Sequence, residues 1–587
     1  MLPVSFRASP SATRLLPTLL TGLLLGTIAT STAEAQLLAF PGAEGAGRFT
    51  TGGRGRGTAG TTVFEVTSLA DTNTPGTLRY ALSQSVTAVP ARTVVFRVCG
   101  TIHLLTRLNI PRNTTLAGQT APGDGICISD KQVTVNGDNV IIRFLRFRLG
   151  DRYQKLVNAA GNPVDGSGND DALSGTDRKN LIIDHCTMSW SNDEAFTFYG
   201  AACDSMTLQW NLISEPLNYS YHFEAGDTDY ERHGYGGIWG GKRASFHHNM
   251  FAHCLSRTPR WNGTRYGAAI GSENCDFRNN VIYNWGSNNV YGGEGGNYNI
   301  VNNYYKPGPS TTSNRSRIMN PYRQTTAPVL PFPKIYLTGN YVDGNATNTA
   351  RNWRGVGMQG SSLADTVLSK VTTEFNIGPV VTESAQDAYN SVLAGVGCVL
   401  PARDALDRRI MDDVRNRTGA IIDVQGGYPH GTPYAQTTGA WPVLTCGTSP
   451  ADTDHDGMPD AWETANGLNP NNAADRNTTA PNGYPNLENY LNGLVVIPTA
   501  TRPGSKATGS LLLYPNPATE QITLAHPRAG RQARIAVYNF VGQRVLSRSA
   551  AAGSEETAFT FDNLPKGNYL VVYTDEQVTL SAKCARE

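Results

Sequence analysis

Short β-type runs recur between about residues 60 and 345 of this 587-residue chain, and several of them share one local pattern. In that pattern an asparagine is followed by two apolar or aromatic residues, and the separations between successive copies are 38, 31, 23 and 37 residues. Uneven spacing of this size is typical of a solenoid whose coils carry loops of different length. The five asparagines are Asn211, Asn249, Asn280, Asn303 and Asn340.

This repeat predicts an all-β protein built on a right-handed parallel β-helix, with apolar residues inside and asparagine side chains stacked at one turn. The 61 glycines and the 17% share of charged residues also favour β structure with many turns. An antiparallel sandwich or a propeller with asparagine-rich turns is the alternative. Because 49 basic residues nearly balance 48 acidic ones, we expect no nucleic-acid partner. We also expect a monomer.

The N-terminus has the pattern of a secretory signal. Arg7 and Arg14 precede the apolar run LLPTLLTGLLLGTIA, and Ala33-Glu34-Ala35 lies just before Gln36. The apolar run is short for a membrane-spanning helix, which makes a membrane anchor the weaker reading. We therefore expect residues 1–35 to be removed, and we expect no membrane span after cleavage.

Export permits disulfides, and the chain has nine cysteines, none of them in a CxxC pair. Cys398 and Cys446 lie apart from the others, beyond the repeats, so we predict a bridge between them. The six earlier cysteines are expected to be small buried residues on strands.

Beyond about residue 400 the chain changes character, and DTDHDGMPDAWE at 452–463 fits a calcium-binding loop of the EF-hand type. Gly457 stands at the sharp turn of this loop, and Asp475 is a candidate for a degenerate second loop. An acidic linker without an ion is the alternative. The predicted ligands are Asp452, Asp454, Asp456, Asp460 and Glu463.

Residues 498–510 have the composition of a linker, and 511–587 alternate apolar and polar residues as a small β-sandwich does. Tyr514-Pro-Asn-Pro and Leu564-Pro-Lys-Gly-Asn-Tyr569 resemble the C-terminal sorting domain of the type IX secretion system. The resemblance implies that the type IX machinery is a partner and that the protein is secreted or held at the cell surface. A carbohydrate-binding sandwich is the alternative.

Three motifs between about Phe40 and Tyr341 resemble those of the pectate lyases of polysaccharide lyase family 1, and they keep the family's order. They are Asp184-His185, Gln209-Trp210-Asn211 and Arg257-Thr258-Pro259-Arg260. The resemblance implies a domain plan of a signal peptide (1–35), a β-helix catalytic domain (36–400), an extension with the calcium loop (401–497), a linker (498–510) and a sorting domain (511–587).

The resemblance also implies an active-site Ca²⁺ and a catalytic arginine. Asp171, which lies 13 residues before Asp184, matches a calcium-binding position of the family, and its neighbour Asp170 and the acids Asp193 and Glu194 are further candidates. Since neighbouring residues on a strand face opposite ways, we expect only one of Asp193 and Glu194 to bind.

Arg257 matches the arginine that the family uses as Brønsted base, although a guanidinium is normally protonated. The family's second arginine is replaced by Asn262, and its substrate-binding lysine is missing from its usual setting. His185 is expected to be structural. Candidate substrate-binding residues are Arg260, with Arg265 as its alternative, His233 and Lys242, with Arg243 as an alternative cation, and the sugar-stacking rings Tyr235 and Trp239.

Together these features predict a secreted pectate lyase that cleaves the acidic plant cell-wall polysaccharides pectate and pectin by calcium-assisted β-elimination to unsaturated oligogalacturonides. Two other functions remain open. A polygalacturonase-type hydrolase on a similar β-helix would need carboxylates flanking the scissile bond. A non-catalytic polysaccharide-binding surface protein would follow if the missing cations had abolished turnover.

Overall fold

The computed structural model describes residues 36–54, 60–360, 363–495, 511–530, 533–539, 544–561, 564–575 and 579–586. The predicted signal peptide at 1–35 and the predicted linker at 498–510 lie outside these residues. In the part of the chain that is described, no helix is long and apolar enough to cross a membrane.

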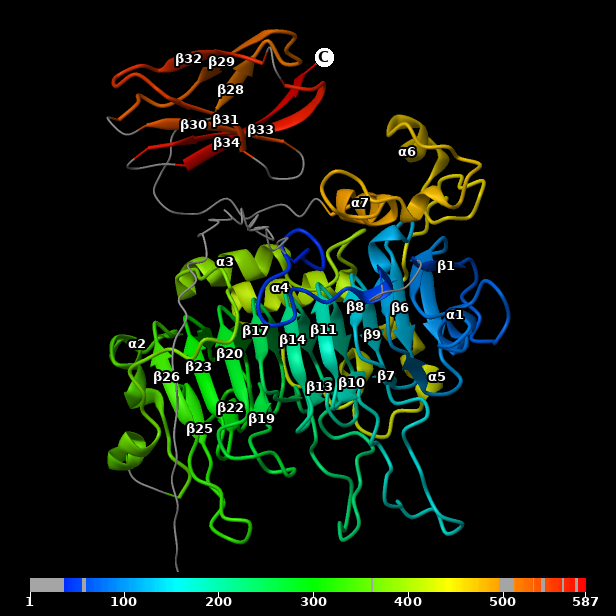
Figure 1. Ribbon diagram of the computed structural model, residues 1–587. Coiled ribbons are helices and arrows are strands. Elements are labelled where there is room, and N and C mark those ends of the chain that lie inside the picture. Colours follow the sequence, from blue (N-terminus) through cyan, green and yellow to red (C-terminus); the bar gives the residue numbers. More distant parts are fainter. Residues whose placement is uncertain are drawn as a thin grey trace, which may run out of the picture. The chain divides into compact units, whose positions relative to one another are not determined.

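Three long parallel sheets run side by side from about residue 62 to residue 342, and Figure 1 shows their strands stacked in rows along one axis. Each coil passes through the first sheet, then the third, then the second. The first sheet consists of β1 Thr62–Val66, β2 Arg92–Phe96, β5 Thr114–Ala117, β8 Val140–Arg143, β11 Lys179–Asp184, β14 Asp204–Gln209, β17 Ala244–His247, β20 Asn274–Arg278, β23 Asn297–Val301 and β26 Lys334–Thr338.

The other two sheets complete the coils and confirm the predicted parallel β-helix. The second sheet consists of β4 Leu108–Ile110, β7 Val133–Val135, β10 Leu173–Thr176, β13 Phe196–Tyr199, β16 Ile238–Trp239, β19 Arg260–Trp261, β22 Val290–Gly292 and β25 Met319–Pro321. The third sheet consists of β3 Gly100–His103, β6 Ile126–Ser129, β9 Arg146–Arg148, β12 Thr187–Ser189, β15 Leu212–Ser214, β18 Met250–Ala252, β21 Val281–Tyr283, β24 Tyr304–Lys306 and β27 Tyr341–Val342.

The predicted asparagine stack lies at the turn between the first and third sheets. Asn211 donates to Asn249, Asn249 to Asn280, Asn280 to Asn303 and Asn303 to Asn340, at N···O distances of 2.9 to 3.1 Å. All five side chains are buried. Each amide also bonds to backbone groups of the neighbouring coil, so the ladder satisfies polar groups that the tight turn would otherwise leave unpaired.

Helices pack outside the solenoid. α3 (Ala385–Gly395) and α4 (Ala405–Asn416) cover the third sheet, where Val392, Ile410 and Val414 contact Leu212, Met250 and Val281 in one apolar cluster. The remaining helices are α1 Leu78–Ser83, α2 Ala346–Ala350, α5 Tyr434–Thr437, α6 Asp460–Ala465 and α7 Asn486–Gly493, with the 3₁₀ turns η1 Gly52–Arg54, η2 Gly118–Thr120, η3 Asn352–Gly355, η4 Leu363–Leu368, η5 Gln425–Gly427, η6 Thr438–Ala440 and η7 Asp475–Asn477.

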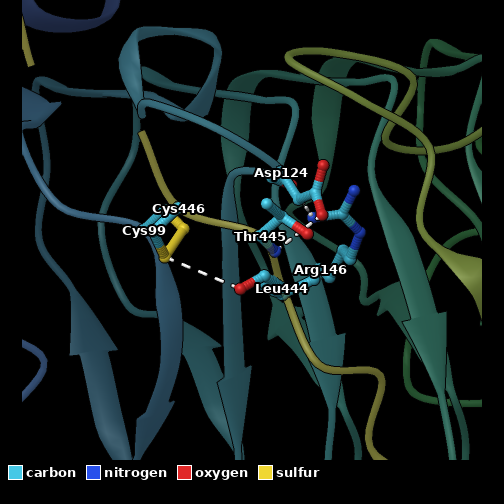
Figure 2. Close-up of a disulfide and its surroundings, with 6 residues drawn as sticks. All are labelled: Cys99, Asp124, Arg146, Leu444, Thr445 and Cys446. Atoms are coloured by element: carbon cyan, nitrogen blue, oxygen red, sulfur yellow. Dashed lines mark hydrogen bonds between the residues drawn. A yellow bond between two sulfur atoms is a disulfide. The ribbon is translucent and has the colours of Figure 1, made fainter. Parts of the chain in front are cut away.

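The disulfide differs from the prediction. Cys446 pairs with Cys99, which lies 347 residues earlier next to β3 (Figure 2). Cys398 is free and buried. Cys398 is held against the third sheet, where its backbone N–H donates to Thr187. The segment that carries Cys446 instead runs on to the first coils, where the Thr445 backbone exchanges hydrogen bonds with Asp124. The other five early cysteines are free and buried, as expected.

The C-terminal region forms two antiparallel sheets that share one apolar core, as the alternating pattern predicts. Ile522 and Leu524 of one sheet belong to the same cluster as Ile535, Val537 and Val571 of the other. The strands are β28 Leu512–Tyr514, β29 Gln521–Ala525 and β32 Glu556–Thr560 in the first of these sheets, and β30 Arg534–Asn539, β31 Arg544–Ser549, β33 Gly567–Thr574 and β34 Thr579–Arg586 in the second.

Candidate active site

Four successive coils bring candidate residues into one row at the turn that leads into the second sheet. Asp171 precedes β10, Glu194 precedes β13, Tyr235 precedes β16 and Arg257 precedes β19. Parallel bridges join Glu194 to Tyr235 and Tyr235 to Ser256, and the Glu194 N–H donates to Asp171 Oδ1 at 2.9 Å. Because stacked coils lie about 4.8 Å apart, residues distant in sequence become neighbours in this row.

Three carboxylates gather at the start of the row. One oxygen from each of Asp171, Asp193 and Glu194 lies within 4.8 Å of the others. Burial, reinforced by the charge of Asp193, raises the pKa of Asp171 well above its ordinary value. Burial alone would also raise the pKa of Asp193, but the hydrogen bond and the charge of His233 lower it. A cation would relieve the repulsion among these oxygens, so the group fits a hard, oxygen-binding ion such as Ca²⁺.

Arg257 lies beside this carboxylate group. Its Nη1 contacts Glu194 Oε1, and its guanidinium lies 4.4 Å from the centre of the Tyr235 ring. The side chain keeps 22% of its surface exposed, and the backbone adopts the left-handed region at φ 58°. The arrangement presents a guanidinium, held between a carboxylate and an aromatic face, to the solvent side of the row.

Two further arginines lie in the same region. Arg260 on β19 donates to Glu294 Oε1 at 2.9 Å and lies over the Tyr291 ring at 5.2 Å. Arg265 lies 3.9 Å from the other oxygen of Glu294, and burial followed by the charge of Arg260 lowers its pKa. Nothing in the sequence pattern marked Glu294 or Tyr291 in advance, because both come from the next coil.

Several predicted residues lie elsewhere or have other partners. Trp239 is wholly buried in the solenoid core and donates to the Phe196 carbonyl, so it offers no face to a sugar and that prediction is wrong. Lys242 is exposed at the turn between β16 and β17, on the first-sheet side of the coil, away from the row. Asp170 pairs with Arg107 and accepts from Gln154 Nε2 at 3.0 Å, outside the three-carboxylate group.

His233, predicted to bind substrate as a cation, instead contacts other residues of the site. Its Nε2 lies 2.8 Å from Asp193 Oδ1, and its ring stacks on His222 with centroids 3.7 Å apart. His185, predicted to be structural, is stacked between Phe144 and Trp210, and its Nδ1 lies 2.8 Å from Asp184 in the buried turn.

The C-terminal loop forms a second group of carboxylates. Oxygens of Asp452, Asp454 and Asp456 lie within 4.8 Å of one another, as do those of Asp456, Glu463 and Asp475. Both carboxylate oxygens of Asp454 and of Glu463 are buried without a hydrogen-bond partner among the described residues. Burial and neighbouring acids raise the pKa of Asp456 and that of Glu463 to about 7 each. Unpartnered, crowded carboxylates of this kind suit a bound cation.

One predicted ligand of this loop is replaced. Asp460, the first residue of α6, accepts hydrogen bonds from the Thr453 N–H and hydroxyl at 2.7 and 2.8 Å, so its oxygens are already engaged. Asp475 of η7 stands in the group instead. Gly457 has φ 92° at the turn, which the loop motif requires and which glycine adopts without strain.

A parallel β-helix that carries an acidic cluster beside a half-buried arginine on one outer face has the architecture of a polysaccharide lyase. Comparison with known proteins agrees. The chain is 32% identical over 478 residues to a probable pectate lyase C of Aspergillus flavus, which covers 78% of this chain and 94% of that protein. It is 30% identical over 469 residues to a probable pectate lyase C of Emericella nidulans, with 78% and 93% covered. The chain therefore belongs to the pectate lyase family.

Solved structures and a domain family complete the comparison. The major cedar pollen allergen Jun a 1 aligns at 18% identity and a TM-score of 0.41, covering 60% of this chain and 92% of that one. A Bacillus subtilis pectate lyase mutant aligns at 15% identity and 0.37, covering 61% and 96%. Residues 512–585 match the family described as a secretion system C-terminal sorting domain. The protein is accordingly secreted or attached to the cell surface.

Proposed function

We propose that the protein cleaves pectate by β-elimination, with Ca²⁺ held by Asp171, Asp193 and Glu194 and with Arg257 as the base. The observation that carries this proposal is the contact between Arg257 and Glu194 in a row that begins at Asp171, in a member of the pectate lyase family. Asp193 and Glu194 each have an oxygen in the three-carboxylate group, which supports two calcium ligands from this coil rather than the one expected.

The reaction removes the hydrogen on C5 of a uronate, next to its carboxylate. When bound, Ca²⁺ would supply a Lewis acid that neutralises charge on that carboxylate. Arg257 takes the C5 proton, the C4–O bond breaks as the C4–C5 double bond forms, and the leaving oxygen gains a proton from water. Tyr235 and Glu194 fix the guanidine in place, so that little reorganisation is needed.

The protonation state of Arg257 decides the rate. A guanidine acts as base only when neutral, so we expect the rate to rise towards alkaline pH. Arg260 and Arg265 are suited to hold a neighbouring uronate carboxylate.

An elimination assay tests the proposal. Purified protein is incubated with polygalacturonate, with and without chelator, and the ultraviolet absorbance of unsaturated uronate is recorded. Arg257→Ala should keep its fold and its polysaccharide binding and lose about 10²- to 10⁴-fold in rate, the usual contribution of a general base. Arg243→Ala is the matched control, because Arg243 is exposed just before β17, away from the row, and among the described residues its side chain pairs with Asp204 and Ser205.

The products separate the proposal from the other two functions. Saturated reducing ends would indicate a hydrolase, and binding without any product would indicate a non-catalytic surface protein. Wild-type elimination by Arg257→Ala would refute the role of this arginine. A single symmetric species in sedimentation would support the expected monomer.

A further inference from the structure

A pair of stacked histidines lies at the edge of the carboxylate group. His222 and His233 come from one loop between β15 and β16, and backbone bonds between Glu231 and His222 and between His233 and Asn218 fix the two strands of this loop against each other. Their side chains are 3% and 7% exposed. His222 lies in an irregular loop, so no periodic pattern in the sequence marks it.

One nitrogen of each ring is already engaged. His222 Nδ1 lies 3.0 Å from the Gly168 carbonyl oxygen, so it carries the proton and leaves the lone pair of the ring on Nε2. His233 Nδ1 lies 3.4 Å from a carboxylate oxygen of Glu231. A carbonyl or carboxylate behind the ring is the usual way in which proteins orient a histidine towards a metal.

The other nitrogen of His222 has no hydrogen-bond partner among the residues that the structure describes. Its Nε2 is buried, and the nearest acid, Glu224, lies 3.8 Å away with a side chain that is 71% exposed. Burying a polar atom without a partner is unfavourable unless something else satisfies it. Ligand atoms of His222, His233 and Asp193 all lie within 4.8 Å of one another, so the unpartnered nitrogen belongs to a three-ligand group.

We propose that Asp193, His222 and His233 bind a divalent transition metal of the zinc class. Two imidazoles and a carboxylate suit zinc, cobalt, nickel or iron, whereas Ca²⁺ takes oxygen ligands. Ligands bound tetrahedrally at about 2.1 Å are separated by about 3.4 Å, so modest side-chain rotation closes the group around an ion. The fourth position is left for water or for a substrate oxygen.

The shared aspartate gives this site a consequence for the reaction. Asp193 also belongs to the group with Asp171 and Glu194, so a metal on the histidines withdraws an oxygen from the proposed calcium ligands. This consequence rests on the proposed function: zinc at the histidines inhibits elimination, and excess Ca²⁺ or a zinc-selective chelator restores it. The binding itself does not rest on that function.

Cobalt spectroscopy tests the binding without any activity measurement. Full-length protein is stripped with chelator, dialysed and titrated with Co²⁺, which absorbs strongly in the visible when four-coordinate with nitrogen ligands and only weakly when held by carboxylates. The wild type should develop a saturable, intense visible band that Zn²⁺ abolishes. Glu231→Gln should weaken the affinity about 10- to 100-fold, as loss of an orienting partner does.

Variants assign the band to these residues. His222→Gln should lose it, while His222→Cys should keep it and add sulfur-to-cobalt charge transfer in the near ultraviolet. The matched control is His103→Gln, which removes a histidine 3.0 Å from Asp130 without a second histidine beside it, and this variant should keep the wild-type band. Asp171→Asn should keep the cobalt band even where it abolishes calcium-dependent elimination, so the two proposals can fail separately. Absence of an intense band in folded wild type, or an unchanged band in His222→Gln and His222→Cys, would overturn the site.

Discussion

Removal of the cation from the C-terminal loop should make the stability of that segment depend on pH. The pKa of Asp456 is raised to about 7 in the folded chain from an ordinary value of 3.8, so the folded state binds the proton more tightly than the unfolded state. Stability is then fully present below about pH 4 and is lost as the pH rises through about 7. Glu463, which is raised to about 7 as well, acts in the same direction.

The size of the effect follows from the shift. A displacement of about 3 pH units corresponds to about 4 kcal/mol. The two acids interact, so protonation of one relieves part of the repulsion on the other and their effects do not add, and we expect about 2 kcal/mol between pH 4 and pH 8 in chelator. In saturating Ca²⁺ the carboxylates stay ionised and paired with the ion, so the slope should vanish and the segment should become more stable at high pH.

Hydrogen exchange of residues 452–495 measures this locally, corrected for the intrinsic effect of pH on exchange. The segment contacts the first coils through Arg97 with Asp452 and through His455 with Glu65, so loss of protection should extend to β1 and β2. Glu463→Gln should reduce the pH dependence of this protection in chelator. Asp460→Asn is the matched control inside the same motif and should leave it intact. Equal protection at both ends of the pH range in chelator would refute the reasoning.

Four other perturbations have definite expected outcomes. Cys446→Ser should abolish the disulfide-linked peptide pair seen by non-reducing peptide mapping and lower the melting temperature, whereas Cys398→Ser should leave the pair intact. Trp239→Ala should cost about 3 to 5 kcal/mol of unfolding free energy in denaturant titration, since it empties core volume. Tyr235→Leu should change that free energy less and should lower the elimination rate, because it removes a half-buried ring that contacts Arg257 and His233. Asn280→Ala should cost about 3 kcal/mol by the same titration, because backbone groups on two coils lose their partner.

The sequence predicts those parts of the fold in which every coil repeats the same local hydrogen bonds and packing. The Asn280 rung is one example: an asparagine at a left-handed turn followed by apolar residues has the same partners in every coil, so spacing alone identifies the ladder. The acidic motif at 452–463 is similar in part, since Asp452, Asp454, Asp456 and Glu463 lie close together in sequence and in the structure, whereas Asp475 joins them from outside the motif. Cys99 could not be assigned in this way, because its partner depends on where a segment 347 residues later returns to the solenoid.

The site is harder to predict because its residues come from different coils. Asp171, Glu194 and Arg257 are separated in sequence by loops of unequal length, and only the stacking of coils makes them neighbours. Trp239 is a residue whose orientation the sequence could not predict. On β16 its ring points into the core, and a two-residue strand gives too little alternation for the sequence to say which face it takes.

Asn262 stands where the family has a second arginine, and other arginines of this chain lie nearby. Asn262 is 1% exposed, and its amide donates to Glu273 and to the Gly263 carbonyl, so an arginine there would bury its charge against the edge of the core. Burial raises the pKa of Glu273 to about 7, which leaves that acid a poor counter-ion near neutral pH. Arg260 and Arg265 lie instead on either side of Glu294, and the Nη1 of Arg260 has no hydrogen-bond partner among the described residues. Because that nitrogen is buried, a uronate carboxylate would reach it only after neighbouring side chains move, and under the proposed function Arg260 and Arg265 are the residues expected to replace the missing arginine.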